Sequence, residues 1–261
     1  MNLNNRKGIK MTNFIMGGWS QNTRDVAPAG FAYTMYGMIT NLDGLTAGTP
    51  SSPGWSPKTT AAPNAETGSV MWTYGGGGAT PENMPNTEIE NYEIVSCTNQ
   101  QHWAGVDFDD ESHMNIDNVV AVMKQLKKQQ PPLQSSYTFL AGWDYNNPNN
   151  SSSGKLINAA VQKVAQENCS DRFILMCYAD EMWSKADITA NVGSAIERTI
   201  NNGVPKKEVM LALTSVGLNA ENLDYFLEQV TAYDIGGLFI WDFAALPPSY
   251  LSTIKNKLDI N

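Results

Sequence analysis

The sequence predicts a single (β/α)8 TIM barrel, an α/β fold in which parallel strands alternate with helices. Short apolar runs alternate with amphipathic stretches along the chain, and most of the apolar runs are nearly continuous. Continuous apolar strands are typical of a parallel sheet that helices cover on both faces. The expected strands span residues 13–18, 32–39, 69–74, 104–109, 137–142, 173–178, 209–213 and 237–241. Eight such strands with right-handed crossovers close into a barrel, although the pattern alone also fits an open doubly wound sheet.

Apolar residues at helical spacing predict helices between the later strands. Four sets have this spacing: Ile116, Val119, Val120, Met123 and Leu126; Leu156, Ile157, Ala160, Val161 and Val164; Val192, Ile196 and Ile200; and Leu223, Phe226, Leu227 and Val230. Pro131 and Pro132 end the first helix, and Gly203 closes the third. Residues 43–68 are rich in Pro, Gly, Ser and Thr and show no helical pattern. We expect a long loop there, on the face of the barrel where active sites lie.

Length and composition exclude several classes of protein. The chain has 261 residues, 42% of them hydrophobic, which suits one domain spanning residues 1–261. The net charge of -9 leaves no basic face for a nucleic acid. No apolar stretch has the length of a membrane span, and the N-terminus lacks a secretory signal, so we expect a cytoplasmic protein or export by an atypical route. Three cysteines without metal-type spacing predict buried side chains, and we expect no metal and no cofactor.

Four carboxylates lie within five residues at the end of the fourth expected strand: Asp107, Asp109, Asp110 and Glu111. Because side chains alternate along a strand, Asp107, Asp109 and Glu111 share one side, which in a barrel is the lumen. Like charges held close in a partly desolvated site cannot all ionise, so the pKa of at least one of them should rise. A carboxyl that keeps its proton near neutral pH can serve as a general acid.

Acidic clusters at strand ends also have other roles. They can bind Ca²⁺ or Mg²⁺, cap the following helix, or form a solvated turn. Val106 and Phe108 alternate with the acids, and on the residues alone catalysis or metal binding is as well supported as a structural role. His102 and His113 flank the strand but lack the partners of a zinc site or a Ser/His/Asp triad. The glycine run at 75–78 lacks the Lys-Ser/Thr of a phosphate loop.

Around this strand the sequence resembles glycoside hydrolase family 18. The family carries D-G-x-D-x-D-x-E at the end of its fourth barrel strand, and residues 104–111 read A-G-V-D-F-D-D-E. Residues 69–77, S-V-M-W-T-Y-G-G-G, resemble the family's third strand, with Thr73 in the place of its Ser. L-M-C-Y at 175–178 resembles the sixth-strand motif M-x-Y-D, and G-G-L-F-I-W at 236–241 resembles the eighth-strand motif G-G-x-x-x-W. The resemblance covers residues 69–245 well and the first sixty residues loosely.

The resemblance implies retaining, substrate-assisted hydrolysis of β-1,4-linked N-acetylglucosamine, in chitin oligomers or in the chitobiose core of N-glycans. Glu111 would protonate the glycosidic oxygen while the substrate's own acetamido oxygen attacks C1. Asp109 would bind the acetamido N–H and stabilise the oxazolinium ion, and Asp107 would share a proton with Asp109. Tyr178 would hold the acetamido oxygen in line, and Trp241 would pack under the sugar ring.

Other residues are candidates for contact with such a sugar. Gly75 and Gly76 end the third strand, Met176 lies in the sixth-strand motif, and Trp143 follows the fifth strand. Trp183 is a further candidate because sugars stack on indole faces, although core packing is the commoner role of a single Trp. The polar loop at 145–154 either lines a ligand cleft or is a solvated linker.

Two departures from the family pattern support a rival hypothesis. Ala104 stands in the place of the first Asp, and Ala179 in the place of the Asp after the sixth-strand Tyr, with Asp180 one residue late. The rival is a catalytically weak or inactive carbohydrate-binding or storage protein on the same barrel. The complete set of three lumenal carboxylates favours a glycosidase of the chitinase or endo-β-N-acetylglucosaminidase type, whose activity these substitutions could reduce. The short connection 214–235 leaves no room for an insertion domain and predicts an open, endo-acting groove.

Overall fold

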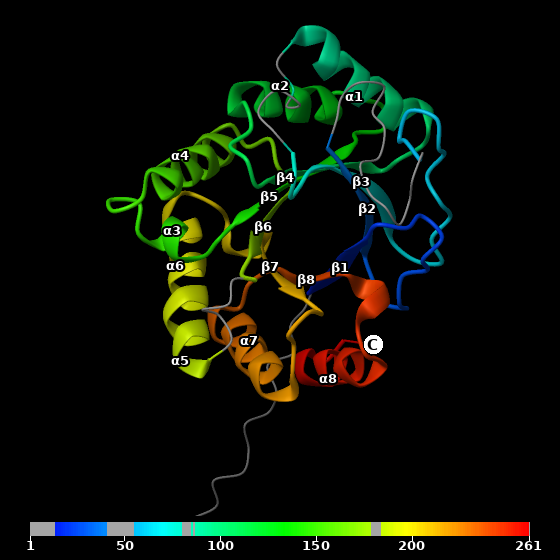
Figure 1. Cartoon of the computed structure of the whole chain (residues 1–261). Helices are drawn as coiled ribbons and strands as arrows, with labels where there is room; N and C mark the ends of the chain where they lie inside the picture. The colour runs from blue at the N-terminus through cyan, green and yellow to red at the C-terminus, as the bar shows by residue number, and fades with distance from the viewer. Residues whose placement is uncertain (1–13, 41–54, 80–84, 86, 179–183, 261) are drawn as a thin grey trace, which may run out of the picture.

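A computed structural model describes residues 14–40, 55–79, 85, 87–178 and 184–260 of the chain. Its strands are Ile15–Ser20 (β1), Tyr33–Ile39 (β2), Ser69–Gly75 (β3), Gly105–Asp110 (β4), Gln134–Leu140 (β5), Arg172–Met176 (β6), Val209–Thr214 (β7) and Gly237–Trp241 (β8). Each strand pairs in parallel with the next, and β1 also pairs with β8, so the sheet closes into a barrel. Figure 1 looks into this barrel, with the helices arranged around it. The predicted (β/α)8 barrel is confirmed, and the open sheet is excluded.

The strands lie where the sequence places them, with small shifts at their ends. β5 begins at Gln134 rather than at residue 137, because Gln134 pairs with Gly105 of β4. β6 ends at Met176, so that Tyr178 stands beyond the strand. Residue 13, the predicted start of β1, lies outside the described residues.

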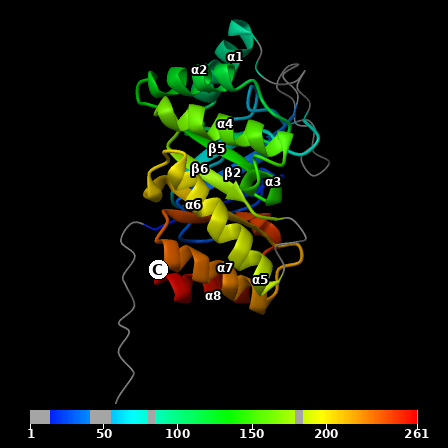
Figure 2. The same ribbon diagram turned by 90° about the vertical axis from the view of Figure 1, so that its left-hand side faces the viewer.

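Among the residues that the structure describes, helices follow six of the strands. They are Glu88–Gln100 (α1), Ile116–Lys127 (α2), Trp143–Asn146 (α3), Ser152–Gln166 (α4), Lys185–Asp187 (α5), the π-helical turn Ile188–Val192 (η3), Gly193–Asn201 (α6), the 3-10 turn Lys206–Glu208 (η4), Ala220–Tyr233 (α7), the 3-10 turn Phe243–Ala245 (η5) and Pro248–Leu258 (α8). Figure 2, turned by 90°, shows α4, α6 and α7 packed along the outside of the barrel. No helix within the described ranges is long and apolar enough to cross a membrane.

The four predicted apolar faces are found in α2, α4, α6 with η3, and α7, with one correction. Leu156 of α4 is 54% exposed, because the buried face of that helix runs through Ile157 and Val161 instead. The apolar pattern of the sequence predicts neither α1 nor α8. In α1 the apolar residues Ile89 and Tyr92 are exposed, so its buried side chains do not form one apolar stripe.

The loop at 43–68 was expected on the active-site face, and its described part lies elsewhere. Trp55 is buried with its ring centroid 6.1 Å from that of Trp103, which precedes β4. The Trp103 indole N–H donates to the Thr60 carbonyl oxygen at 3.1 Å. These contacts attach residues 55–60 to the N-terminal end of β4, opposite the end that carries the acidic residues. Residues 43–54 lie outside the described part.

Side chains fill the barrel lumen. The lumenal layer consists of Trp19, Met35, Met71, Ile174, Met176, Met210, Ala212 and Phe239. Gly17 of β1 makes room for it, since a Cβ there would lie 2.5 Å from the Phe239 ring. Nearer the N-terminal ends of the strands, the buried Arg172 guanidinium stacks on the Tyr33 ring at 3.9 Å. A filled lumen leaves the mouth at the C-terminal ends of the strands as the place for a ligand.

Candidate active site

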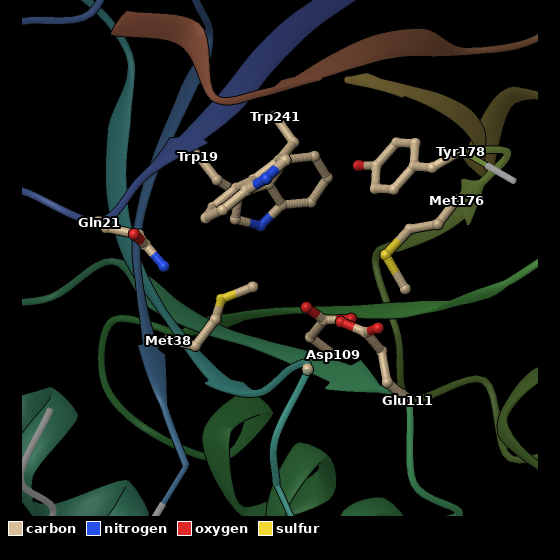
Figure 3. Close-up of a pocket in the computed structure, with 9 residues that line it drawn as sticks. Trp19, Gln21, Met38, Asp109, Glu111, Met176, Tyr178 and Trp241 are labelled. Carbon is tan, nitrogen blue, oxygen red and sulfur yellow. The ribbon is translucent and has the colours of Figure 1, made fainter. Parts of the chain in front are cut away.

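A cavity of about 240 Å³, hereafter the central cavity, opens at the C-terminal ends of the strands. Figure 3 shows its lining: Trp19, Gln21, Met38, Gly77, Asp109, Glu111, Met176, Tyr178 and Trp241. Parallel strands end on one face of the barrel, which is why residues so far apart in sequence meet here. Of the nine predicted site residues, Asp109, Glu111, Met176, Tyr178 and Trp241 line the cavity. The other four lie beneath it or beside it.

Asp107 lies beneath the central cavity, fully buried in the lumen. Its Oδ1 accepts hydrogen bonds from the hydroxyls of Ser136 (2.6 Å) and Thr138 (2.7 Å), both on β5. Its Oδ2 accepts from the Trp19 indole N–H (3.0 Å) and the Thr73 hydroxyl (3.1 Å). Burial raises the pKa of Asp107, and the four hydrogen bonds oppose that rise. These donors, hereafter the Asp107 cage, fill the acceptor positions of the carboxylate and hold Asp107 against the barrel wall.

Asp109, two residues along β4, has the opposite environment. It is 2% exposed, and its Oδ1 has no hydrogen-bond partner within the described part of the chain. Burial, and then the negative charges of Glu111 and Asp107, raise its pKa well above the ordinary value. The pKa of this unpartnered carboxyl is therefore raised, as the sequence predicted for at least one member of the cluster.

Glu111 stands just beyond β4, at the wall of the central cavity (Figure 3). Burial raises the pKa of its carboxyl, a hydrogen bond from the Gly77 backbone lowers it, and the charge of Asp110 raises it. A raised pKa keeps a carboxyl protonated at higher pH, as a general acid requires.

Of the four glycines at 75–78, Gly77 is the one that lines the cavity. Gly75 and Gly76 join the backbone of β3 to that of β4 behind the cavity: the Gly76 N–H donates to the Asp109 carbonyl oxygen at 2.8 Å. Gly75 has a φ of +106°, and a Cβ there would lie 2.2 Å from that same carbonyl oxygen. Gly75 and Gly76 therefore fix the position of the Asp109 backbone and do not line the space where a ligand would lie.

Tyr178 and the two indoles complete the cavity. Burial and the nearby charges of Asp109 and Glu111 raise the pKa of Tyr178 well above its ordinary value, so its hydroxyl stays a donor. Trp241, at the end of β8, pairs in register with Trp19 of β1. Their indoles lie together on one side of the cavity, across from Asp109 and Glu111 (Figure 3).

Asp110 points to the opposite side of β4 and has a structural role. Its Oδ1 accepts from the Met114 backbone N–H at 2.8 Å, and its Oδ2 accepts from the Tyr137 hydroxyl at 2.6 Å. The following helix is capped by Asn115 instead, so Asp110 holds the turn before that helix to the Tyr137 side chain of β5. Within the described ranges no group of three or more His, Cys, Asp or Glu side chains is placed to hold a metal ion. His113 lies apart from the central cavity, with its Nε2 3.3 Å from the Ser153 hydroxyl.

Several predictions lie beside the cavity or outside the described residues. Trp143 is 49% exposed at the start of α3 and does not line the central cavity. Residues 147–151 of the expected polar loop at 145–154 connect α3 to α4, whereas its two ends are helical, and Tyr145 is buried with its hydroxyl 3.0 Å from that of Thr199. Ala179, Asp180 and Trp183 fall outside the described residues.

The sequence reading gave no site role to Trp19, Gln21, Met38 or Gly77. It noted Thr73 only as the substitute for a family serine, and it did not identify the β5 members of the Asp107 cage. The available signal was weak: Ser136 and Thr138 are small polar residues at alternate positions of a strand that also contains the polar residues Gln134 and Ser135. That spacing puts both on the lumenal face, opposite Asp107 and Asp109 of β4.

The chain resembles known proteins in structure rather than in sequence. No family model and no curated protein sequence matches it. Solved structures do match, and those named as family 18 chitinases or an endo-β-N-acetylglucosaminidase of family 18 share the barrel fold of this chain. The resemblance predicted from the sequence is therefore confirmed at the level of the fold.

Three of these structures indicate the range of proteins that share the fold. A fungal endo-β-N-acetylglucosaminidase of family 18 superposes with a TM-score of 0.65 at 15% identity, over 95% of this chain and 98% of that one. The catalytic domain of a hyperthermophilic chitinase from Pyrococcus furiosus gives 0.64 at 12% identity, over 95% and 97%. A xylanase and α-amylase inhibitor protein from Scadoxus multiflorus gives 0.58 at 12% identity, over 94% and 97%.

Proposed function

We propose that the protein is a retaining glycoside hydrolase that cleaves β-1,4-linked N-acetylglucosamine with the help of the substrate's own acetamido group. Chitin oligomers and the chitobiose core of N-glycans are the substrate classes. Glu111 is the general acid and base, and Asp109, Tyr178 and Trp241 bind and orient the reacting sugar.

The observation that carries this proposal is the unpartnered Oδ1 of Asp109, buried beside Glu111 in the central cavity. An unsatisfied buried acceptor costs about 1–3 kcal/mol, which a ligand N–H placed against it would recover. The acetamido N–H of an N-acetylamino sugar is such a donor. A neutral sugar also suits a site whose acidic side chains would repel an anion.

The chemistry follows from where the groups lie. Glu111 donates its proton to the glycosidic oxygen as the C1–O bond breaks, and the acetamido oxygen attacks C1 to form an oxazolinium ion. In this proposal Asp109 accepts a hydrogen bond from the N–H of that ion and stabilises its positive charge, and the Tyr178 hydroxyl donates to the acetamido oxygen. Glu111, now ionised, takes a proton from the water that opens the oxazolinium ion. Two inversions at C1 give retention.

A second candidate function is a catalytically weak or inactive carbohydrate-binding or storage protein. Ala104 supports it, because the family pattern has an Asp at this position. The fold also occurs in the xylanase and α-amylase inhibitor protein described above. Such a protein would use the indole wall of Trp241 and Trp19 without turnover.

One assay separates the two functions. The wild type is incubated with a fluorogenic chitobioside and, separately, with a high-mannose glycoprotein, beside Glu111→Gln and the matched surface variant Glu228→Gln. We expect product from the wild type and from Glu228→Gln, and a loss of at least 100-fold in Glu111→Gln, since general acid catalysis contributes about 10²–10⁴-fold. Equal background rates in all three would reject the enzyme, and chitin-oligomer binding without turnover would then support the second function.

A further inference from the structure

A cavity of about 220 Å³, hereafter the flank cavity, lies on the outside of the barrel beside β2. Its floor comes from Thr34 and Tyr36, which alternate with the lumenal Met35 and therefore point outward from the sheet. Its other walls come from residues 23–27 and 29, between β1 and β2, and from residues 64–67, before β3. Among the described residues, it shares none of its lining with the central cavity.

The flank cavity exists because the first connection of the barrel is irregular. Residues 21–32 join β1 to β2 without a helix, so the outer face of β2 is covered by this connection and by the segment before β3. Figure 1 shows both segments, blue and cyan, outside the barrel on the side of β2. The space between them is smaller than the pockets that hold drug-sized ligands, which limits a ligand to the size of one amino acid or one sugar.

Hydrogen bonds hold the walls of the flank cavity in place. The Tyr36 hydroxyl donates to the Asp25 carbonyl oxygen at 2.6 Å, and the Asp25 carboxylate accepts from the Ser20 hydroxyl. On the other side, the Ser69 N–H donates to the Ala32 carbonyl oxygen at 2.8 Å, which fixes the end of the segment before β3. Asp25 is therefore a structural residue, and a ligand that enters the cavity has little ordering of the protein to offset.

One polar group of the floor has no partner. Thr34 is 1% exposed, and its hydroxyl makes no hydrogen bond with the described residues. A buried hydroxyl left unpaired is unfavourable, and a ligand that forms a hydrogen bond with it recovers that loss. The Thr34 hydroxyl therefore favours a polar ligand over an apolar one.

Two opposite charges at the flank cavity are also unpaired. Arg24 and Glu66 both line it and are both exposed. The ion pairs found among the described residues are all formed by lysines, and neither Arg24 nor Glu66 takes part in one. A guanidinium binds a carboxylate through two parallel hydrogen bonds, and a side-chain carboxylate binds an ammonium group. A small ligand that carries both a carboxylate and an ammonium group would pair both residues.

Other small polar ligands match the flank cavity less well. A sugar would lack a stacking surface there, because the apolar walls are alanine and valine side chains and Tyr36 is only 3% exposed. An inorganic anion would pair Arg24 but would be repelled by Glu66 and by Asp25, which line the same space. A zwitterion satisfies both signs of charge at once.

We propose that the flank cavity binds a free α-amino acid. Arg24 binds its carboxylate, Glu66 binds its ammonium group, and the Thr34 hydroxyl forms a hydrogen bond with it at the floor of the cavity. The site is separate from the proposed catalytic site and does not depend on the glycosidase function. It also explains why a hydroxyl without a partner lies buried on the outer face of β2.

The test begins with a screen of ligands on the full chain. Each of the standard α-amino acids is added singly, thermal unfolding is followed, and the amino acid with the largest effect is titrated by calorimetry. At a hundred times its dissociation constant, a ligand of the folded state alone should raise the melting temperature by roughly 5–10 °C. The methyl ester and the N-acetyl derivative of this amino acid each lack one of its two charges, and should bind at least tenfold more weakly.

Variants then assign the two charges to their partners. Arg24→Gln should weaken binding at least tenfold and no longer distinguish the amino acid from its methyl ester, and Glu66→Gln should no longer distinguish it from its N-acetyl derivative. Thr34→Val should weaken binding by about threefold to tenfold, the effect of one hydrogen bond. Lys155→Gln and Glu228→Gln remove the same charges at exposed positions elsewhere, and should bind as the wild type does.

Three results would overturn the proposal. The first is the absence of a thermal shift with every amino acid. The second is full binding by both Arg24→Gln and Glu66→Gln, which would place the ligand elsewhere. The third is a larger shift with N-acetylglucosamine or with inorganic phosphate that Thr34→Val removes, which would make the flank cavity a sugar or an anion site. Far-UV circular dichroism checks the fold of each variant, and because Arg24 and Glu66 are exposed, their replacement removes little packing.

Discussion

The same substitution at two buried threonines should change stability in opposite directions. Thr138 and Thr34 are both almost fully buried in barrel strands. The Thr138 hydroxyl donates to Asp107 Oδ1 at 2.7 Å, whereas the Thr34 hydroxyl has no hydrogen-bond partner among the described residues. Valine keeps the shape of threonine and replaces its hydroxyl with a methyl group. Comparing the two variants therefore isolates the contribution of one hydrogen bond in the Asp107 cage to stability.

The magnitudes follow from the two environments. A hydrogen bond to a charged group contributes about 1.5–3 kcal/mol, and the added methyl group of valine returns about 0.8 kcal/mol of burial. Thr138→Val should therefore lower the free energy of unfolding by about 1–2 kcal/mol. Thr34→Val removes an unsatisfied buried hydroxyl, and should raise the free energy of unfolding by about 1 kcal/mol.

Equilibrium unfolding in urea at neutral pH measures both variants against the wild type. The two midpoints should lie on opposite sides of the wild-type midpoint with similar slopes, so that the shift reports stability alone. A Thr138→Val protein as stable as Thr34→Val at neutral pH would refute the view that the Asp107 cage stabilises the barrel.

The remaining predictions concern the carboxyls at the mouth and the glycines behind them. Asp109→Asn should abolish turnover yet raise the melting temperature at pH 7. Because the pKa of Asp109 is raised in the folded state, ionisation of this carboxyl opposes folding as pH increases. Removing the carboxyl should raise the melting temperature by about 2–4 °C for each kcal/mol of that opposition. The gain should vanish near pH 3, where Asp109 is protonated in both states, and calorimetry at the two pH values checks it. The rate should fall as pH rises through the raised pKa of Glu111, because the acid then loses its proton; a pH–rate profile without an alkaline limb would count against Glu111 as the acid. Gly75→Ala should destabilise by about 2 kcal/mol or more, since its Cβ would lie 2.2 Å from the Asp109 carbonyl, while Gly78→Ala, with nothing within 4 Å, should cost about 1 kcal/mol.

The barrel could be predicted from the sequence because its strands are buried on both faces. Continuous apolar runs such as those of β6 and β7 leave few alternatives to a covered parallel sheet. The apolar pattern does not predict α1, because its apolar residues Ile89 and Tyr92 face solvent and its apolar side chains do not all lie on the buried face. Its strongest signal was local, a capping box in which Thr87 and Glu90 bind each other's backbone N–H groups.

The orientation of the acidic residues was predictable, and their partners were not. Strand alternation alone places Asp107 and Asp109 in the lumen and sends Asp110 outward. No spacing rule connects Asp107 with Trp19, 88 residues earlier in the chain, because that contact depends on how the first and fourth strands face each other across the lumen. The sequence could therefore propose which residues act, while the structure was needed to find what surrounds each one.

Those surroundings decide where a proton resides in the free protein. Four donors stabilise the charge on Asp107, while Asp109 has an unpartnered oxygen and the negative charges of Glu111 and Asp107 nearby. A proton entering the site therefore binds Asp109 before Asp107. A protonated Asp109 still offers a carbonyl oxygen to a ligand N–H, and it leaves Glu111 with one like charge fewer beside it. The barrel thus gives two carboxyls only two residues apart different proton affinities. It supplies hydrogen-bond donors to Asp107, while among the described residues Asp109 Oδ1 has none.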